Sequence, residues 1–377
     1  MKKIFLTAIL IFIVAISSIA SAADFNSVDW SKVPTFTNKA DFARYIQKCE
    51  ANCMSSVPVK FQGGLFVDGD EVLMFVKNTQ TVDVISANYA GSIRVLYQLH
   101  LSPGVKVAYA YRTKNTSILN NDERQLYNVA VEIVEKAARK PTPIMKEFYI
   151  HDEITARVEW YNTTSTSKTP RHGNAIGALI DGRATCQGYS DAFYMLGTML
   201  GLNVGKMSGV TRGTQHIWNT ITFDDGKIYA VDCTWDDASF STSKEGGYNN
   251  YIYFNAAEEI LNVTHSWSSA TEPQLVPKID NRYFYFAPES TNIVFYEEKA
   301  EDALYKIAER IAKEDFRLSW GMSKFEQRYN DKAFVLNRLT KEILPKKFKF
   351  KPDTDIRVDL TRRGQWLFFI VDAKKRK

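Results

Sequence analysis

Two apolar segments joined by a short polar turn constrain the fold of this chain more than any other feature. The segments cover Gln215–Phe223 and Lys227–Trp235, and Asp224-Asp225-Gly226 separates them. A three-residue loop that ends in glycine favours a β-hairpin in which a type I turn precedes a left-handed glycine. Such a loop pairs Phe223 with Lys227, and this pairing sets the register of both strands.

The predicted register brings a histidine and an aspartate to the same face of the hairpin. His216 and Asp232 become diagonal neighbours within reach of a hydrogen bond, because side chains alternate along a strand. Trp218 and Thr234 share this face, whereas Cys233 points to the opposite one. An aspartate inside an apolar strand is costly to bury without a partner, and His216 provides one. The alternatives are a core histidine without function and an aspartate that caps the end of the strand.

A cysteine upstream of the hairpin lies at the predicted start of an apolar helix. After Cys186, apolar side chains recur at helical spacing: Tyr189, Phe193, Leu196 and Leu200. Thr185 is the predicted N-cap, and Gly201 ends the helix. The unpaired N–H groups of a helix start favour a thiolate over a thiol and can donate to a developing oxyanion. A buried cysteine with a structural role is the alternative.

A thiol, an imidazole and a carboxylate are the parts of a cysteine acyl-transfer site. The motifs around them resemble those of the transglutaminase-like superfamily, in its bacterial exported branch. The resemblance follows the chain through six stretches: Tyr149–Asp152, Gly177–Tyr189, His216–Asn219, Val231–Asp237, Tyr251–Phe254 and His265–Trp267. It implies an α+β, papain-like fold in which the nucleophile helix packs on an antiparallel sheet.

The resemblance also implies roles for individual residues. It makes Cys186 the nucleophile, His216 the general base and acid, and Asp232 the residue that orients the imidazole. His151 and His265 recur in the resemblance, but neither belongs to this triad. We interpret His151 as a packing residue or a residue at a helix end.

Further residues around the predicted site are expected to shape a substrate cleft. Gln187, Trp218 and His172 are the candidate cleft residues, and Gly188 leaves room for a substrate backbone to approach. The family usually has alanine after the histidine, where this chain has Ile217. That difference alters the expected shape of the substrate and leaves the triad intact.

The chain is predicted to carry a flanking region on each side of the core. The expected parts are a signal peptide over 1–22, an N-terminal α+β region over 23–140, the transglutaminase-like core over 141–270 and a C-terminal α+β region over 277–377. Each flank is predicted as a helix, a strand, a second helix and further strands, so a duplicated domain is one interpretation.

Specific elements follow from local patterns in the flanks. In the first flank, Ser102-Pro103-Gly104 is predicted as a turn that joins strands over Arg94–Leu101 and Lys106–Arg112. In the second flank, a helix over Ser323–Leu344 is predicted to precede a strand over Lys347–Lys351.

The first residues have the pattern of an export signal. Lys2 and Lys3 precede an apolar run over Ile4–Ile19, and Ala20-Ser21-Ala22 is a small-x-small cleavage site. Cleavage before Ala23 predicts an exported, periplasmic or secreted protein, with an uncleaved N-terminal anchor as the alternative. No later segment is long and apolar enough to predict a membrane span.

Charge and cysteine content limit the classes of partner. The formal charge of +5 falls to +3 when two lysines leave with the signal, which is too little to indicate nucleic-acid binding. Basic runs at 346–351 and 374–377 are typical of solvated surfaces, with an acidic envelope polymer as an alternative partner. A helix predicted over Lys39–Cys53 would place Cys49 and Cys53 on one face, where they could form a disulfide in an oxidising compartment. A metal site would need two more ligands.

Together these features predict an exported enzyme that attacks peptide or side-chain amides through a thioester. The chemistry requires no metal, nucleotide or organic cofactor. Hydrolysis is favoured over crosslinking, because water is the default acceptor unless a site excludes it. Proteins and cell-wall peptides are the candidate substrates. The alternative is a non-catalytic peptide- or envelope-binding module that uses the same core.

Overall fold

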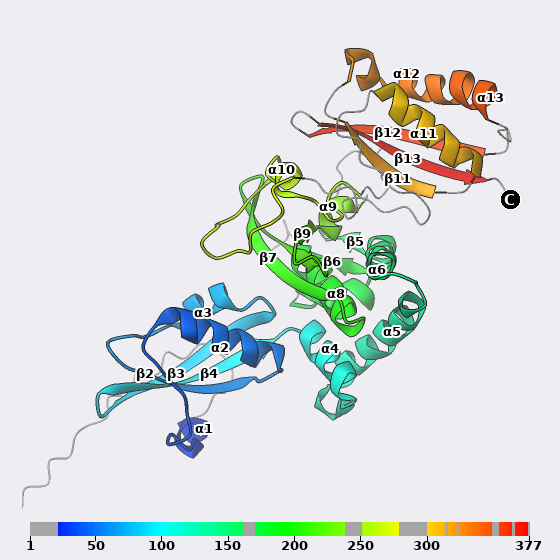
Figure 1. The fold of residues 1–377 in the computed structure, drawn as a ribbon. Helices are drawn as coiled ribbons and strands as arrows, with labels where there is room; N and C mark the ends of the chain where they lie inside the picture. The colour runs from blue at the N-terminus through cyan, green and yellow to red at the C-terminus, as the bar shows by residue number, and fades with distance from the viewer. Residues whose placement is uncertain are drawn as a thin grey trace, which may run out of the picture. The chain divides into compact units, whose positions relative to one another are not determined.

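The computed structural model describes residues 22–161, 170–237, 251–278, 300–313, 316–322, 325–348, 354–363 and 366–375. The chain divides into two compact units, Met1–Arg124 and Gln125–Lys377 (Figure 1). The predicted signal peptide up to Ser21 and residues 162–169 lie outside the described residues. Within the described part of the chain, no helix is long and apolar enough to cross a membrane.

The first unit contains a four-stranded sheet with two helices against it (Figure 1). Its strands, in the sheet order β1-β2-β4-β3, are β1 (Thr35–Phe36), β2 (Ser56–Phe61), β4 (Ser92–Leu101) and β3 (Thr79–Tyr89). Its helices are α1 (Ala22–Ser27), α2 (Lys39–Ala51), α3 (Gly69–Phe75), α4 (Pro103–Thr113) and the 3-10 turn η1 (Thr116–Ile118). Alternate residues of β2 and β4, such as Val59 and Tyr97, pack with Phe42 of α2 into one buried core.

The strand predicted over Lys106–Arg112 is wrong, because this segment forms helix α4. Ser102 is the N-cap of α4 and Pro103 its first residue, positions that both residue types favour. The antiparallel partner of β4 is instead β3. Those two strands meet at Ala90-Gly91, where both residues have positive φ, as a type I′ hairpin turn requires.

Helix α5 covers Asn121–Ala138, and its N-cap is Asn120. The Asn120 side chain accepts from the Glu123 N–H at 2.9 Å, and the Glu123 carboxylate accepts from the Asn120 N–H at 2.9 Å. This reciprocal pair is a capping box, and it fixes where the helix begins.

The core of the second unit packs a helix on an antiparallel sheet, as expected. Its sheet has the order β10-β7-β8-β9 and consists of β10 (His265–Ser266), β7 (Asn203–Thr211), β8 (Thr214–Thr222) and β9 (Ile228–Val231). The main helix is α8 (Cys186–Met199), whose stripe of Tyr189, Phe193 and Leu196 is buried. The remaining elements are α6 (Pro143–Arg157), β5 (Glu159–Trp160), η2 (Pro170–Gly173), α7 (Ala175–Leu179), β6 (Arg183–Ala184), α9 (Cys233–Asp236) and α10 (Glu258–Leu261). The chain therefore has an α+β fold.

The predicted register of the β8–β9 hairpin is confirmed. Asn219 pairs with Val231, and Gly226 adopts a positive φ of 74° in the connecting turn. However, β9 ends at Val231, four residues earlier than predicted. Asp232 becomes the N-cap of α9 because its carboxylate binds the next backbone N–H groups, which end the strand. Thr234 therefore lies in a helix and not on the sheet face.

The C-terminal region contains a three-stranded antiparallel sheet in the order β11-β13-β12. Its elements are α11 (Ala300–Lys313), β11 (Phe316–Met322), η4 (Gln327–Asn330), α12 (Lys332–Asn337), the π-helical segment η5 (Arg338–Ile343), α13 (Leu344–Lys347), β12 (Thr354–Arg363) and β13 (Trp366–Lys375). The single helix predicted over Ser323–Leu344 is thus divided, and it continues to Lys347. The strand predicted to begin at Lys347 is wrong at that residue, and its end at 349–351 lies outside the described residues.

The two flanking sheets share a topology, apart from the additional edge strand β1 of the first sheet. In the first, α2, β2, α3, β3 and β4 follow one another, and β4 pairs with both β2 and β3. In the second, α11, β11, the helical stretch 332–347, β12 and β13 follow the same order, and β13 pairs with both β11 and β12. This similarity is consistent with the duplicated domain suggested by the sequence, which stays an interpretation.

Candidate active site

Cys186 is the first residue of α8, and its side chain is partly exposed. Thr185 is the N-cap, as predicted, and its N–H donates to the His172 carbonyl at 2.8 Å. The Gly188 N–H donates to the Thr185 carbonyl, which starts the hydrogen bonding of the helix. The N–H groups before it belong to the free first turn of α8, where a helix carries partial positive charge.

The candidate cleft residues around Cys186 differ in accessibility. Gln187 is exposed in the first turn of α8, and His172 is half-buried with its ring 4.0 Å from that of Tyr161. Gly188 does not leave room for a substrate. A Cβ there would lie 2.8 Å from the His172 carbonyl oxygen, so glycine allows η2 to pack against the helix.

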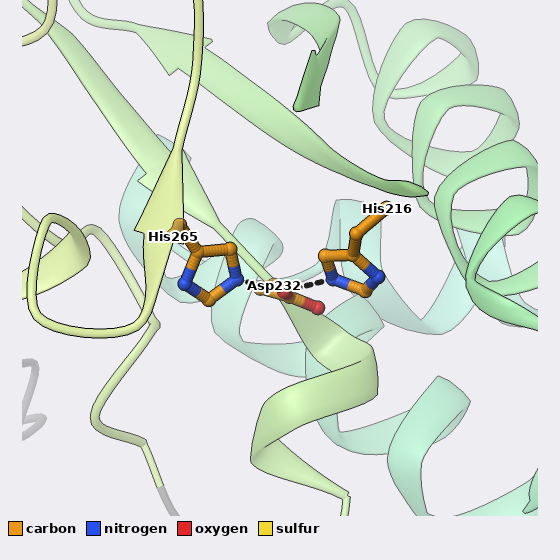
Figure 2. Close-up of side chains that lie close together, drawn as sticks. All are labelled: His216, Asp232 and His265. Atoms are coloured by element: carbon orange, nitrogen blue, oxygen red, sulfur yellow. Dashed lines mark hydrogen bonds and ion pairs between the residues drawn. The ribbon is translucent and has the colours of Figure 1, made fainter. Parts of the chain in front are cut away.

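His216 and Asp232 meet as the hairpin register predicted. Figure 2 shows the Asp232 carboxylate beside the His216 imidazole, with 2.6 Å between Oδ2 and Nε2. Both residues are buried. The other oxygen, Oδ1, accepts the N–H groups of Thr234 at 2.9 Å and Trp235 at 3.2 Å. These backbone bonds fix the carboxylate at the start of α9.

The surroundings of His216 favour its protonated form. Burial lowers the pKa of His216, but the charge and hydrogen bond of Asp232, followed by a hydrogen bond with Cys186, raise it to about 10. Burial likewise raises the pKa of Asp232, yet His216 and further hydrogen bonds hold it well below the usual range. The structure therefore brings Cys186, His216 and Asp232 together, and the raised pKa of His216 favours its protonated form beside the thiol.

Residues 129–233 match the family described as the transglutaminase-like superfamily. This part of the chain is a transglutaminase-like core. No curated protein matches the chain at a significant level.

Three solved structures resemble the chain at low identity. One, described as a TGase, is 14% identical, with a TM-score of 0.29 over 57% of this chain and 61% of that one. A proposed protease from Parabacteroides distasonis is 10% identical, with a TM-score of 0.27 over 85% and 66%. A proposed cysteine protease from Cytophaga hutchinsonii is 12% identical, with a TM-score of 0.23 over 40% and 61%. The chain spans less than two thirds of the length of each structure.

A second histidine, which lies beyond residues 129–233 in the sequence, also binds the carboxylate. Figure 2 shows His265, from β10, on the other side of Asp232, with its Nε2 3.0 Å from Oδ2. Burial lowers the pKa of His265, which favours a neutral ring. The sequence pattern assigns no role to His265. The only signal was its place in the His265–Trp267 stretch at the end of the resemblance.

Trp218 lies in the core rather than on a cleft wall. Its side chain is buried, with its ring stacked on His216 at 5.8 Å and edge-on to His265 at 5.0 Å. We therefore assign Trp218 to packing against the two imidazoles, because a substrate cannot reach a buried ring.

Within the described residues, His216, Asp232 and His265 also form a group that could hold a metal ion. Their ligand atoms lie within 4.8 Å of one another, and two imidazoles with one carboxylate suit transition metals. Both Nε2 atoms, however, lie at hydrogen-bonding distance from the same carboxylate oxygen. These hydrogen bonds account for the arrangement of all three side chains.

A separate titratable cluster surrounds His151 of α6. His151 is fully buried, and its Nε2 lies 3.1 Å from Oδ2 of Asp236. Burial lowers the pKa of His151, but hydrogen bonds to Asp152 and Asp236 raise it to about 9. Burial raises the pKa of Asp236 to about 7 and that of the adjacent Glu147 to about 8. The structure thus places His151 inside the core, in an ion pair.

Proposed function

We propose that this chain is a cysteine-dependent acyl-transfer enzyme that acts on peptide or side-chain amides. One observation carries the proposal: Asp232, His216 and Cys186 are linked in series inside a transglutaminase-like core. The thiol lies at the start of a buried helix and is partly exposed, whereas the imidazole and carboxylate are buried. A substrate can therefore reach the sulfur while the groups that activate it stay fixed.

The reaction proceeds in two acyl transfers. The Cys186 thiolate attacks the carbonyl carbon, and N–H groups at the start of α8 stabilise the oxyanion. The His216 imidazolium donates its proton to the leaving amine as the C–N bond breaks, which leaves a thioester on Cys186. Neutral His216 then takes a proton from water, whose oxygen attacks the thioester. The C–S bond then breaks and the acid product leaves, so Cys186 is again a thiolate and His216, which holds the proton taken from water, is again an imidazolium.

Hydrolysis is the favoured outcome, because water is present unless a site excludes it. An amine in place of water would give a crosslink by the same steps. Export is part of the proposal, and it is supported by the signal-like sequence of residues 1–22. An exported enzyme of this type would meet proteins and cell-wall peptides as substrates.

To test the proposal, the purified protein is incubated with libraries of peptides and cell-wall fragments. Thioester adducts are then trapped and identified by mass spectrometry. We expect an acyl adduct on Cys186, with hydrolysed product when water is the only acceptor. An added primary amine shows whether crosslinking competes. Cys186→Ala should form neither adduct nor product, whereas Cys233→Ala is the matched control that should form both.

A non-catalytic peptide-binding module remains the second candidate, and thiol reactivity separates the two. The site predicts faster iodoacetamide labelling at Cys186 than at Cys233, because burial raises the pKa of the Cys233 thiol well above its usual value. Equal labelling of the two cysteines in the folded protein would contradict the enzyme and favour the binding module.

A further inference from the structure

The Asp232 carboxylate accepts hydrogen bonds from four donors. Oδ1 accepts the N–H groups of Thr234 and Trp235, and Oδ2 accepts from His216 and His265. An ionised carboxylate has about four lone-pair sites, so these donors occupy its full capacity. Two of the donors are backbone groups, and His216 belongs to the proposed triad. Among the residues that the structure describes, His265 is therefore the one side chain outside the triad that binds the carboxylate.

His265 is itself held firmly in place. Its backbone pairs with Thr211 of β7, and its Nδ1 lies 2.8 Å from the Thr264 hydroxyl. That hydroxyl lies 3.0 Å from the hydroxyl of Tyr253. The rings of Trp218, at 5.0 Å, and Trp235, at 5.1 Å, pack against the imidazole. Because the His265 ring is fixed, its hydrogen bond also fixes the orientation of the Asp232 carboxylate.

The titratable groups that face His265 determine its charge. They are Asp232 from the start of α9, His216 from β8 and Tyr253, whose ring lies 5.4 Å away. Burial and the positive charge of His216 lower the pKa of His265, against the raising effect of Asp232. A neutral His265 donates from Nε2 to the carboxylate and leaves the positive charge on His216.

We infer that His265 is a positioning residue, which holds Oδ2 of Asp232 against His216 while Oδ1 caps α9. The inference rests on the proposed function, since it assigns His265 a part in activating Cys186. Without the His265 donor, the carboxylate keeps only its backbone bonds and His216, and it can turn away from the imidazole. Protonated His216 then loses the carboxylate that stabilises it, so we expect Cys186 to react more slowly.

Three variants test this role without knowledge of the substrate. His265→Leu removes the donor, whereas His265→Gln keeps an N–H donor of similar reach. His151→Leu is the matched control, because His151 is another buried histidine that binds an aspartate of α9. For each variant, the rate of iodoacetamide labelling at Cys186 is measured against pH by mass spectrometry, together with the midpoint of thermal unfolding.

We expect His265→Leu to slow labelling at neutral pH by roughly 10- to 100-fold, the effect of losing one hydrogen bond to a charged group. Its labelling curve should shift to higher pH, and His265→Gln should restore most of the rate. His151→Leu should lower the unfolding midpoint as much without shifting the curve. With a substrate in hand, kcat should fall in His265→Leu while KM changes little.

Unchanged labelling in His265→Leu would overturn the inference, as would an equal shift in His151→Leu, which would indicate a structural effect. If His265→Leu does not fold, His265→Asn takes its place, because its shorter side chain cannot reach the carboxylate. Slow labelling of wild-type Cys186 is a different result, and it would contradict the proposed function itself.

Discussion

Two buried histidine–aspartate pairs lie at opposite ends of the one-turn helix α9. Asp232 caps its start and binds His216, and Asp236 is its last residue and binds His151. The pairs have the same residue types and similar burial. Only the first reaches a partly exposed thiol at a helix start. The difference shows that position relative to a nucleophile, not the pair itself, makes a candidate active site.

The two carboxylates also differ in charge state. The pKa of Asp232 is held far below its usual range, because two imidazoles and two backbone amides satisfy its oxygens. Burial raises the pKa of Asp236 to about 7, against one imidazole and the N–H of Tyr253. The additional donors and the charge of His216 keep the pKa of Asp232 below that of Asp236, which the charge of Asp232 also raises.

The largest expected effect separates the two cysteines near these pairs. Cys186→Ala should lower turnover by about 10,000-fold or more, because no other group can form the thioester. Cys233→Ala should leave turnover within about 3-fold and lower stability by roughly 1 kcal/mol, as a small cavity does. Product formation and urea unfolding measure the two effects. A large loss of turnover in Cys233→Ala would contradict the assignment of a catalytic role to Cys186 and a packing role to Cys233.

The second effect separates the two aspartates. Asp232→Asn should lower turnover by roughly 100- to 10,000-fold, because an amide neither stabilises the imidazolium nor fixes its tautomer. Asp236→Asn should lower the unfolding midpoint and leave most of the turnover. Steady-state kinetics on both variants make the comparison. Equal losses of turnover would show that the two pairs act as one unit.

A smaller effect concerns stability against pH. The pKa values of His151 and His216 are raised from 6.5 to about 9 and about 10, so protonation of these residues favours the folded state. Their contribution to the free energy of unfolding is complete below pH 6.5. It is lost as the pH rises through about 9 and about 10. Burial raises the pKa of Glu147 from 4.5 to about 8, so it destabilises the fold in the same direction as pH rises. The midpoint of thermal unfolding should therefore fall towards pH 10.

Glu147→Gln tests the contribution of this cluster. The amide stays neutral, so the fall in unfolding midpoint between pH 4.5 and 8 should be shallower by roughly 5 °C. Labelling of Cys186 should keep its wild-type pH dependence in this variant. A midpoint curve identical to that of the wild-type protein would mean that Glu147 is ionised in the folded core.

The smallest expected effect concerns metal. Dialysis against EDTA should leave turnover unchanged, because hydrogen bonds satisfy His216, Asp232 and His265 without a cation. The test measures turnover before dialysis, after dialysis and after addition of Zn²⁺ to the dialysed protein. Loss of turnover on dialysis and its recovery with Zn²⁺ would show that these three side chains bind a metal ion.

Local patterns predicted the parts of the site that local chemistry determines. The apolar stripe after Cys186 and the Asp224–Gly226 turn located the helix start and the hairpin register. The end of β9 was missed because the Asp232 side chain binds backbone N–H groups that would otherwise continue the strand. The alternation of apolar residues carries no information on this competition. His265 was missed as a partner because it lies 33 residues from Asp232, on a strand of two residues.

The aspartate of the proposed triad is mounted on a helix of four residues. A helix this short is unstable in water on its own, because the entropy lost in ordering its first turn outweighs the free energy gained from the hydrogen bond formed. Its two ends are held by histidines from α6, β8 and β10, which are distant along the chain. The acyl-transfer site that we propose therefore forms only with the completed fold, and a newly made, unfolded chain has only the ordinary reactivity of a free thiol.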